Sequence, residues 1–164
     1  MSLVVRNAQR AVLVRRVPLR YAACALRDAL GVSRFAVGLV CASNGLMRRL
    51  NGKYRQSSEP TDVLSFPFHR VVAGELPRPR CRDEYNLGDI FLGVEYIHQQ
   101  CRDTGEDFDS VLVVTVAHGL CHLLGYQHNT KDEWQQMYQK EAEILEKLNQ
   151  LTGTSLRPLT AGLF

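Results

Sequence analysis

Hydrophobic residues follow two different periods along this chain, and the period changes from one segment to the next. Alternation of apolar and polar residues, or a short continuous apolar run, is typical of β-strands. Apolar residues that recur every three or four positions are typical of amphipathic helices. We therefore expect strands at 3–14 (a strand or hairpin), 34–42, 62–68 and 87–93, and helices at 18–30, 43–54, 94–103 and 131–151.

The last of these helices has an apolar stripe with one polar interruption. The stripe is predicted to pack in the core, and its apolar members are Trp134, Met137, Tyr138, Ile144, Leu145, Leu148 and Leu151. Glu141 is the interruption, because it falls at the same helical spacing as its apolar neighbours. Residues 69–86 contain two prolines, several charges and little periodicity, so we expect a loop there.

The segment VLVVTV, at 111–116, is less clear by its own composition. Its β-branched residues favour a strand when the segment is considered alone. The histidine spacing that follows it requires a helix, and a buried helix can be apolar all round. We therefore predict a helix here, capped by Asp109 or Ser110, that continues into the histidines.

The mixture of strands and helices predicts the fold class. No repeat, low-complexity tract or linker divides the 164 residues. We therefore expect a single α+β domain over 1–164, with a mixed β-sheet packed with helices.

The content of 45% hydrophobic and 23% charged residues is that of an ordinary globular protein. No apolar run approaches the ~18–20 residues that span a bilayer, so we expect no membrane partner. The five scattered cysteines include no CxxC pair, which favours free thiols over a disulfide framework.

Charge is distributed unevenly along the chain. Residues 1–58 have a net charge of +10, from 11 Lys and Arg against one acid, whereas 59–164 have −7, from nine against 16. A basic first third favours a polyanion partner such as RNA, although solvated arginines on helix and strand surfaces explain it equally well.

Residues 1–27 contain six arginines and no acid, which is also typical of a mitochondrial transit peptide. We expect a mitochondrial location, with the cytoplasm as the alternative, and a structural role, a targeting role or both for 1–27.

The segment HGLCHLLGYQH contains three of the chain's five histidines. His118 and His122 are four residues apart, so on a helix they project from one face. Gly125 stands where a left-handed cap would end that helix and reverse the chain. The turn would then bring His128 back as a third ligand. Three histidines on one zinc ion leave the fourth position for water, which is typical of a catalytic site. Other divalent transition metals fit the same ligands.

The histidine spacing is that of a metzincin-like metal-binding helix, but Gly119 stands where those proteases have a glutamate. A metalloprotease uses that glutamate as its base. Peptide hydrolysis by the usual mechanism is therefore disfavoured. A phosphodiester develops mostly negative charge in its transition state, which a metal ion and an arginine can stabilise. This favours a nucleic-acid substrate. The remaining histidines, His69 and His98, have no partner at useful spacing, and Cys121 is expected to face the core.

Three segments together resemble the YbeY family of metal-dependent endoribonucleases: HGLCHLLGYQH, LNGKYRQSSEPTDVLSFPF and LGDIFLG. The resemblance extends from VVRNAQ to the C-terminal helix and points to a eukaryotic, mitochondrial-type member. It implies one α+β domain with a zinc ion in a cleft. It also implies single-strand-specific RNA cleavage in ribosomal RNA maturation and ribosome quality control. The implied partners are single-stranded or ribosomal RNA and the small ribosomal subunit, including ribosomal protein S11.

The resemblance assigns roles residue by residue. The family's metal ligands fall on His118, His122 and His128, and its functionally important arginine falls on Arg55. Arg55 suits a phosphate contact, because a guanidinium binds phosphate bidentately and stays charged. Three further residues have a weaker assignment, in which ordering of the neighbouring strands is favoured over a supporting role at the metal: Thr61, Asp62 and Asp89.

The chain departs from the family pattern at Gln127, where the family usually has aspartate before the third histidine. A carboxylate missing there would change activity or metal preference if it tunes the metal. Cys121 precedes the second histidine, where its thiol would make the site sensitive to oxidation. Two other functions remain open: a metalloprotease-like hydrolase, and a non-catalytic ribosome-assembly factor with a structural metal.

Overall fold

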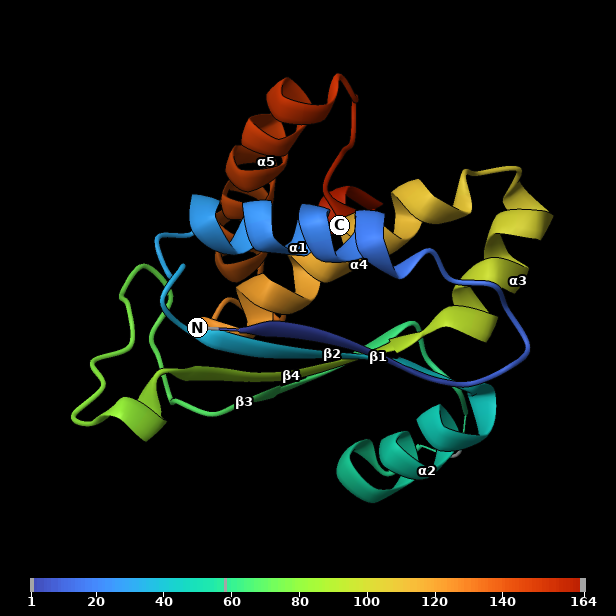
Figure 1. The fold of residues 1–164 in the computed structure, drawn as a ribbon, viewed down its shortest axis with the longest axis horizontal. Coiled ribbons are helices and arrows are strands. Elements are labelled where there is room, and N and C mark those ends of the chain that lie inside the picture. Colours follow the sequence, from blue (N-terminus) through green and yellow to red (C-terminus); the bar gives the residue numbers. More distant parts are fainter. Residues whose placement is uncertain (1, 58, 163–164) are drawn as a thin grey trace.

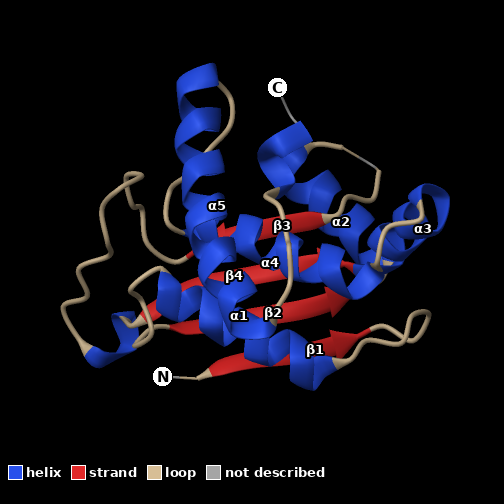
Figure 2. Ribbon diagram, turned by 90° about the horizontal axis from the view of Figure 1, so that it is seen from above, coloured by secondary structure: helices blue, strands red, loops and turns tan. Residues whose placement is uncertain are grey.

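A four-stranded mixed sheet lies at the centre of the computed structural model, which describes residues 2–57 and 59–162. Its strand order is β1-β2-β4-β3, so β1 and β3 form the two edges (Figure 2). The first three of these pair in parallel, and β3 runs antiparallel to β4. The strands are β1 (Leu3–Ala8), β2 (Ala36–Ala42), β3 (Val63–Pro67) and β4 (Asn86–Gly93).

Helices cover the two faces of the sheet unequally (Figure 1). Three pack on one face: α1 (Arg16–Ala29), α4 (Phe108–Leu123) and α5 (Lys131–Thr152). On the opposite face, the described part of the chain places one helix, α2 (Asn44–Arg55), beneath one end of the sheet. The remaining helices are α3 (Val94–Thr104), which directly follows β4, and two short 3-10 turns at Arg82–Glu84 and Leu159–Gly162.

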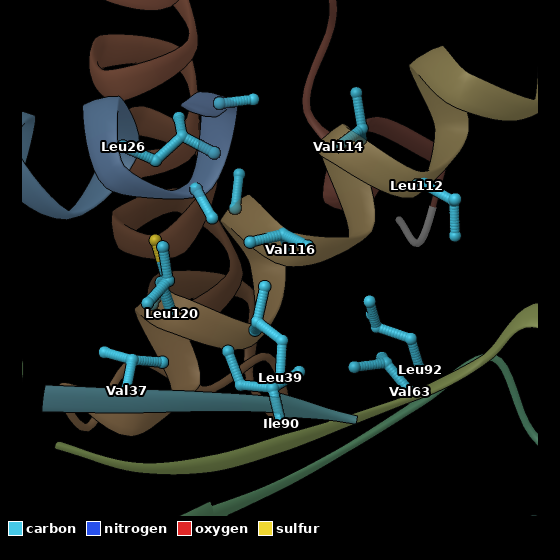
Figure 3. Close-up of a cluster of buried hydrophobic side chains, with 14 of the residues drawn as sticks. Leu26, Val37, Leu39, Val63, Ile90, Leu92, Leu112, Val114, Val116 and Leu120 are labelled. Carbon is cyan, nitrogen blue, oxygen red and sulfur yellow. The ribbon is translucent and has the colours of Figure 1, made fainter. Parts of the chain in front are cut away.

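The main core lies between the sheet and α4 (Figure 3). Leu39 and Ile90 project from the strands toward Val116 and Leu120 of α4, and all four are fully buried. Because α1 and α5 pack on the far side of α4, this helix has neighbours all round. Burial on every side explains why this predicted helix is apolar all round. A smaller cluster around Met47 joins α2 to the other face.

The predicted fold class is confirmed, and all the predicted strands and helices are present among the described residues. Two boundaries were wrong. The first strand ends at Ala8 and not at Val14, because Gln9 folds the chain by exchanging hydrogen bonds with the backbone of Val12. The histidine helix begins two or three residues earlier than predicted, and its cap is Asp107, whose carboxylate accepts from the Ser110 N–H at 3.1 Å.

The arginine-rich start of the chain is part of the fold. Leu3 of β1 and Leu19 and Leu26 of α1 are buried in the main core. A targeting role for residues 1–27 remains a prediction. Among the described residues, no helix combines the length and the apolar character that crossing a membrane requires.

Candidate metal centre

The end of α4 positions the candidate metal ligands. Gly125 adopts a φ of 91°, in the left-handed region, one residue after the helix ends. The Gly125 N–H donates to the His122 carbonyl at 3.0 Å, and the Tyr126 N–H donates to the Cys121 carbonyl at 3.1 Å. This pair of bonds is a Schellman motif, which satisfies the last carbonyls of a helix and reverses the chain. The predicted turn at Gly125 is therefore present, and it returns His128 toward the helix.

Three histidines meet at this turn. One ligand nitrogen from each of His118, His122 and His128 lies within 4.8 Å of the other two. The Nε2 atoms of His118 and His122 are 3.0 Å apart. A tetrahedral ion with metal–nitrogen bonds of about 2.0–2.1 Å would hold two ligand nitrogens roughly 3.3 Å apart. The cluster is therefore compact enough to hold one metal ion.

The second ring nitrogens of the two helical histidines face polar partners. The Nδ1 of His122 lies 2.8 Å from the Tyr126 carbonyl oxygen, which can only accept, so the proton is placed on Nδ1. The Nδ1 of His118 lies 3.5 Å from a carboxylate oxygen of Glu141, and no described atom completes a hydrogen bond to it. Both rings therefore direct Nε2 toward the shared centre. Metal-binding histidines commonly use a carbonyl or carboxylate in this way to fix the tautomer and the ring.

Glu141 is the supporting residue that sequence analysis missed. Its side chain is fully buried, and it accepts hydrogen bonds from the Thr160 hydroxyl at 2.8 Å and the Leu159 N–H at 3.2 Å. A buried carboxylate needs such partners, because an unpaired charge in the core is costly. The signal was present in the sequence, where Glu141 interrupts the apolar stripe of α5. Its distance in sequence from the histidines concealed which group it faces.

Burial disfavours the charged forms of His122 and His128. Burial is the main cause that lowers the pKa of His122 to about 3, and the neighbouring positive forms of His118 and His128 lower it further. Burial also lowers the pKa of His128. Neutral imidazoles have the lone pairs that metal binding requires. At neutral pH His122 and His128 therefore offer lone pairs to a cation.

The cluster opens into a cavity of about 590 Å³. Arg55, at the end of α2, lines the same cavity as the three histidines, so the structure brings all four predicted site residues together. Asp62, Ser65, Gln127, Asn129 and Leu159 are among the other lining residues. The Asp62 carbonyl accepts from the Gly93 N–H at 2.7 Å, and the Thr61 hydroxyl donates to the Asp62 carboxylate at 3.3 Å, so both residues help to order the start of β3.

Other residues considered from the sequence lie elsewhere. Asp89 is exposed on the opposite face of the sheet beside Gly38, so it lies away from the histidines. The Nε2 atom of His69 lies 2.6 Å from the Glu84 carbonyl oxygen, and the ring of His98 packs edge-on against Phe108. Cys121 is fully buried on the core side, and burial raises the pKa of its thiol, so it is neither exposed nor a thiolate ligand.

Gly119 has a packing reason to be glycine. A β-carbon at this position would lie 2.9 Å from Cγ2 of Ile90 and 3.3 Å from the Ser65 hydroxyl. The close approach of α4 to the sheet therefore leaves no room for a side chain. A glutamate at position 119 would have to displace core residues. The space that the catalytic glutamate fills in a metzincin-like protease is here filled by side chains of the sheet.

Comparison with known proteins gives the family. The model of a family described as "Endoribonuclease YbeY" matches residues 18–149, which include Arg55, Gly119 and all three histidines. The chain belongs to the YbeY family. The resemblance carried by the three sequence motifs is thus confirmed.

Individual YbeY proteins match over most or all of their length. A human protein named endoribonuclease YbeY is 55% identical over 165 residues, covering 100% of this chain and 98% of the human protein. The YbeY protein of Desulforamulus reducens is 32% identical, covering 90% of this chain and 97% of its own. A solution structure of a Thermotoga maritima protein has a TM-score of 0.55 at 20% identity, covering 94% of this chain and 97% of that one. The structural likeness supports the fold alone.

Proposed function

We propose that this protein is a metal-dependent endoribonuclease that hydrolyses phosphodiester bonds in single-stranded RNA. The observation that supports this most directly is the group of three histidines with adjacent ring nitrogens in an open cavity. The curated relatives are named endoribonucleases, which supports RNA as the substrate. A purely structural zinc site is usually closed by four protein ligands, so a site of three histidines favours catalysis over a scaffold role.

In this proposal His118 and His122 bind the ion through Nε2, and His128 completes the set. Three imidazoles favour one zinc ion, and other divalent transition metals compete for the same ligands. A divalent ion held there supplies a Lewis acid and, from water, a nucleophile near neutral pH. Glu141 and the Tyr126 carbonyl orient the two helical rings.

Arg55 contacts the phosphate in this proposal. Its side chain is exposed at the cavity, and its positive charge is among the causes that lower the pKa of His122 and His128. The arginine therefore places a cation within electrostatic reach of the metal ligands. A planar guanidinium can bind two phosphate oxygens and stabilise the charge that develops as the bond breaks.

The finer assignments rest on the family resemblance and on the basic first third of the chain. We propose ribosomal RNA as the substrate, in processing steps of ribosome biogenesis. The small ribosomal subunit, including ribosomal protein S11, is the proposed partner. A mitochondrial location is proposed, with the cytoplasm as the alternative. The lack of space beside Gly119 argues against a protease, because a glutamate base would not fit there without displacing Ile90.

The test is cleavage of an end-labelled single-stranded ribosomal RNA fragment by the purified protein, with and without chelator. Arg55→Ala and His128→Ala, prepared identically, are the comparison variants. We expect cleavage by the wild-type protein alone, lost on chelation. Equal cleavage by all three proteins would reveal a contaminating nuclease, and turnover of casein without RNA cleavage would favour a protease.

A further inference from the structure

Helix α2 is strongly basic and has no acidic residue. It contains Arg48, Arg49, Lys53 and Arg55, and no Asp or Glu. Its buried side contains Met47 and Asn51. Arg48, Arg49 and Lys53 project on the outer side and are all exposed. We call these three residues the basic face of α2.

Three other arginines of the basic first third have contacts within the fold. Arg20 donates to the Leu3 carbonyl at 3.0 Å, and Arg27 donates to the Phe35 carbonyl at 3.0 Å. Arg15 lies 3.9 Å from the Asp109 carboxylate. By contrast, Arg48 and Arg49 have no hydrogen bond or ion pair with any residue that the structure describes. The positive charges of α2 are therefore among those in the basic first third that no described acidic group neutralises.

The composition of α2 is unfavourable for an isolated helix. Arg49 and Lys53 are four residues apart, where like charges repel. Gly52 lies on the exposed side, and a β-carbon there would meet only the Ser57 carbonyl oxygen at 3.5 Å, an ordinary contact. Packing therefore does not require the glycine, which is a poor helix residue. Because Gly52 has no side chain, a ligand can come close to the backbone of α2 at this point. The neighbouring cations would then contact a negatively charged ligand.

The C-terminal end of α2 leads into the candidate metal centre. Arg55 lines the cavity with the histidines. Tyr54 is 56% exposed, and its ring packs edge-on against Phe66 of β3 with centroids 5.0 Å apart. Lys53 Nζ lies 5.4 Å from the centre of the same ring. An exposed aromatic ring, held in place and flanked by cations, is a surface on which an unpaired base can stack.

We propose that the basic face of α2, together with Tyr54, binds the segment of single-stranded RNA that flanks the bond held in the cavity. This rests on the proposed nuclease function, because RNA is the polyanion that the cavity would cut. The phosphates would follow Arg48, Arg49 and Lys53, and a base would stack on Tyr54 before the strand reaches Arg55. Phosphate contacts of this kind release counterions, so they make affinity depend on salt.

The test is the salt dependence of binding, measured by fluorescence anisotropy with a labelled single-stranded RNA and metal-loaded protein on ice. Gel electrophoresis of the recovered RNA checks that it is intact. The variant is Arg48→Gln/Arg49→Gln/Lys53→Gln. The matched control, Arg10→Gln/Arg102→Gln/Lys147→Gln, removes the same charge from exposed positions outside α2. Each phosphate contact on a single strand contributes about −0.7 to the slope of log affinity against log salt.

We expect the α2 variant to make this slope shallower by about 2 and the control to leave it near the wild-type value. Tyr54→Leu should weaken binding roughly ten- to a hundredfold with little change in slope, and Tyr54→Phe should restore the affinity. Unchanged slopes in the α2 variant, or equal changes in both triple variants, would overturn the proposal. Loss of ribosomal-subunit association with normal RNA binding would identify a protein-docking surface instead. Binding is measured apart from cleavage, so failure of the nuclease function would be seen separately.

Discussion

Replacement of Glu141 by glutamine tests how the metal ligands are oriented. The substitution keeps the size of a fully buried side chain and replaces one oxygen by an NH₂ group. The remaining oxygen can still accept from Thr160 or Leu159, so the fold should be retained. If the NH₂ group faces His118, it donates to Nδ1 and moves the ring proton to Nε2, where it blocks the lone pair that binds metal.

The expected loss follows from the burial of both partners. Removal of a partner that orients a metal-binding histidine typically costs ~10- to 100-fold in metal affinity, or about 1.4–2.8 kcal/mol. The 3.5 Å separation is longer than the ~2.7–2.9 Å of a strong charge-assisted bond, which favours the smaller value. The complete burial of Glu141 favours the larger loss of metal affinity, because water cannot replace the lost carboxylate. We therefore expect a loss of at least tenfold.

Competition with a chromophoric chelator measures this affinity directly, and thermal unfolding of the metal-free protein checks the fold. The matched control is Glu143→Gln, on the same helix, which removes a half-exposed carboxylate that pairs with Lys140. Surface pairs of this kind contribute ~0–1 kcal/mol, and this one does not reach the metal site. Equal metal affinity in wild type and Glu141→Gln would refute the orienting role.

Four further predictions concern packing, charge, pH and the start of the chain. Gly119→Ala should lower the free energy of unfolding by about 1–3 kcal/mol because Ile90 must move, and an unchanged denaturant midpoint would contradict this. Arg55→Lys keeps the charge but loses the bidentate contact, so RNA cleavage should fall while metal content, measured by atomic absorption, is retained. In the metal-free protein, His122 has a folded pKa of about 3 against 6.5 unfolded, so protons bind the unfolded state first as the pH falls. Stability should therefore drop by about 1 kcal/mol between pH 7.5 and 5.5 in urea titrations, and by less in His122→Asn. Deletion of residues 2–15 removes β1, so it should abolish cooperative unfolding, and a stable truncated protein would support a cleaved leader.

Sequence alone was most informative where the determinants are local. The positions of His118, His122 and His128 follow from helical periodicity and one glycine, all within eleven residues. The helix through 111–116 was predicted correctly only because the histidines outweighed the β-branched composition of that segment. Asp107 was missed because a cap two or three residues earlier satisfies the same pattern of apolar residues.

Long-range contacts were beyond the sequence patterns. Nothing in the local sequence of α5 indicates that Glu141 faces His118, because this contact depends on how two helices pack. The order of the strands, with β4 between β2 and β3, likewise depends on tertiary packing. The proximity of Arg55 to the histidines came from the family resemblance, and the shared cavity then gave it a physical basis.

The carboxylate of Glu141 connects the histidine site to the C-terminal turn at Leu159–Gly162. One of its oxygens faces His118 and also accepts from Thr160, and the other accepts from the Leu159 N–H. Trp134 donates to the Thr160 carbonyl at 2.6 Å and so fastens the same turn to the start of α5. The C-terminal turn is thus a component of the ligand-orienting network. A fusion or label attached close to Leu159 and Thr160 is therefore expected to lower metal affinity.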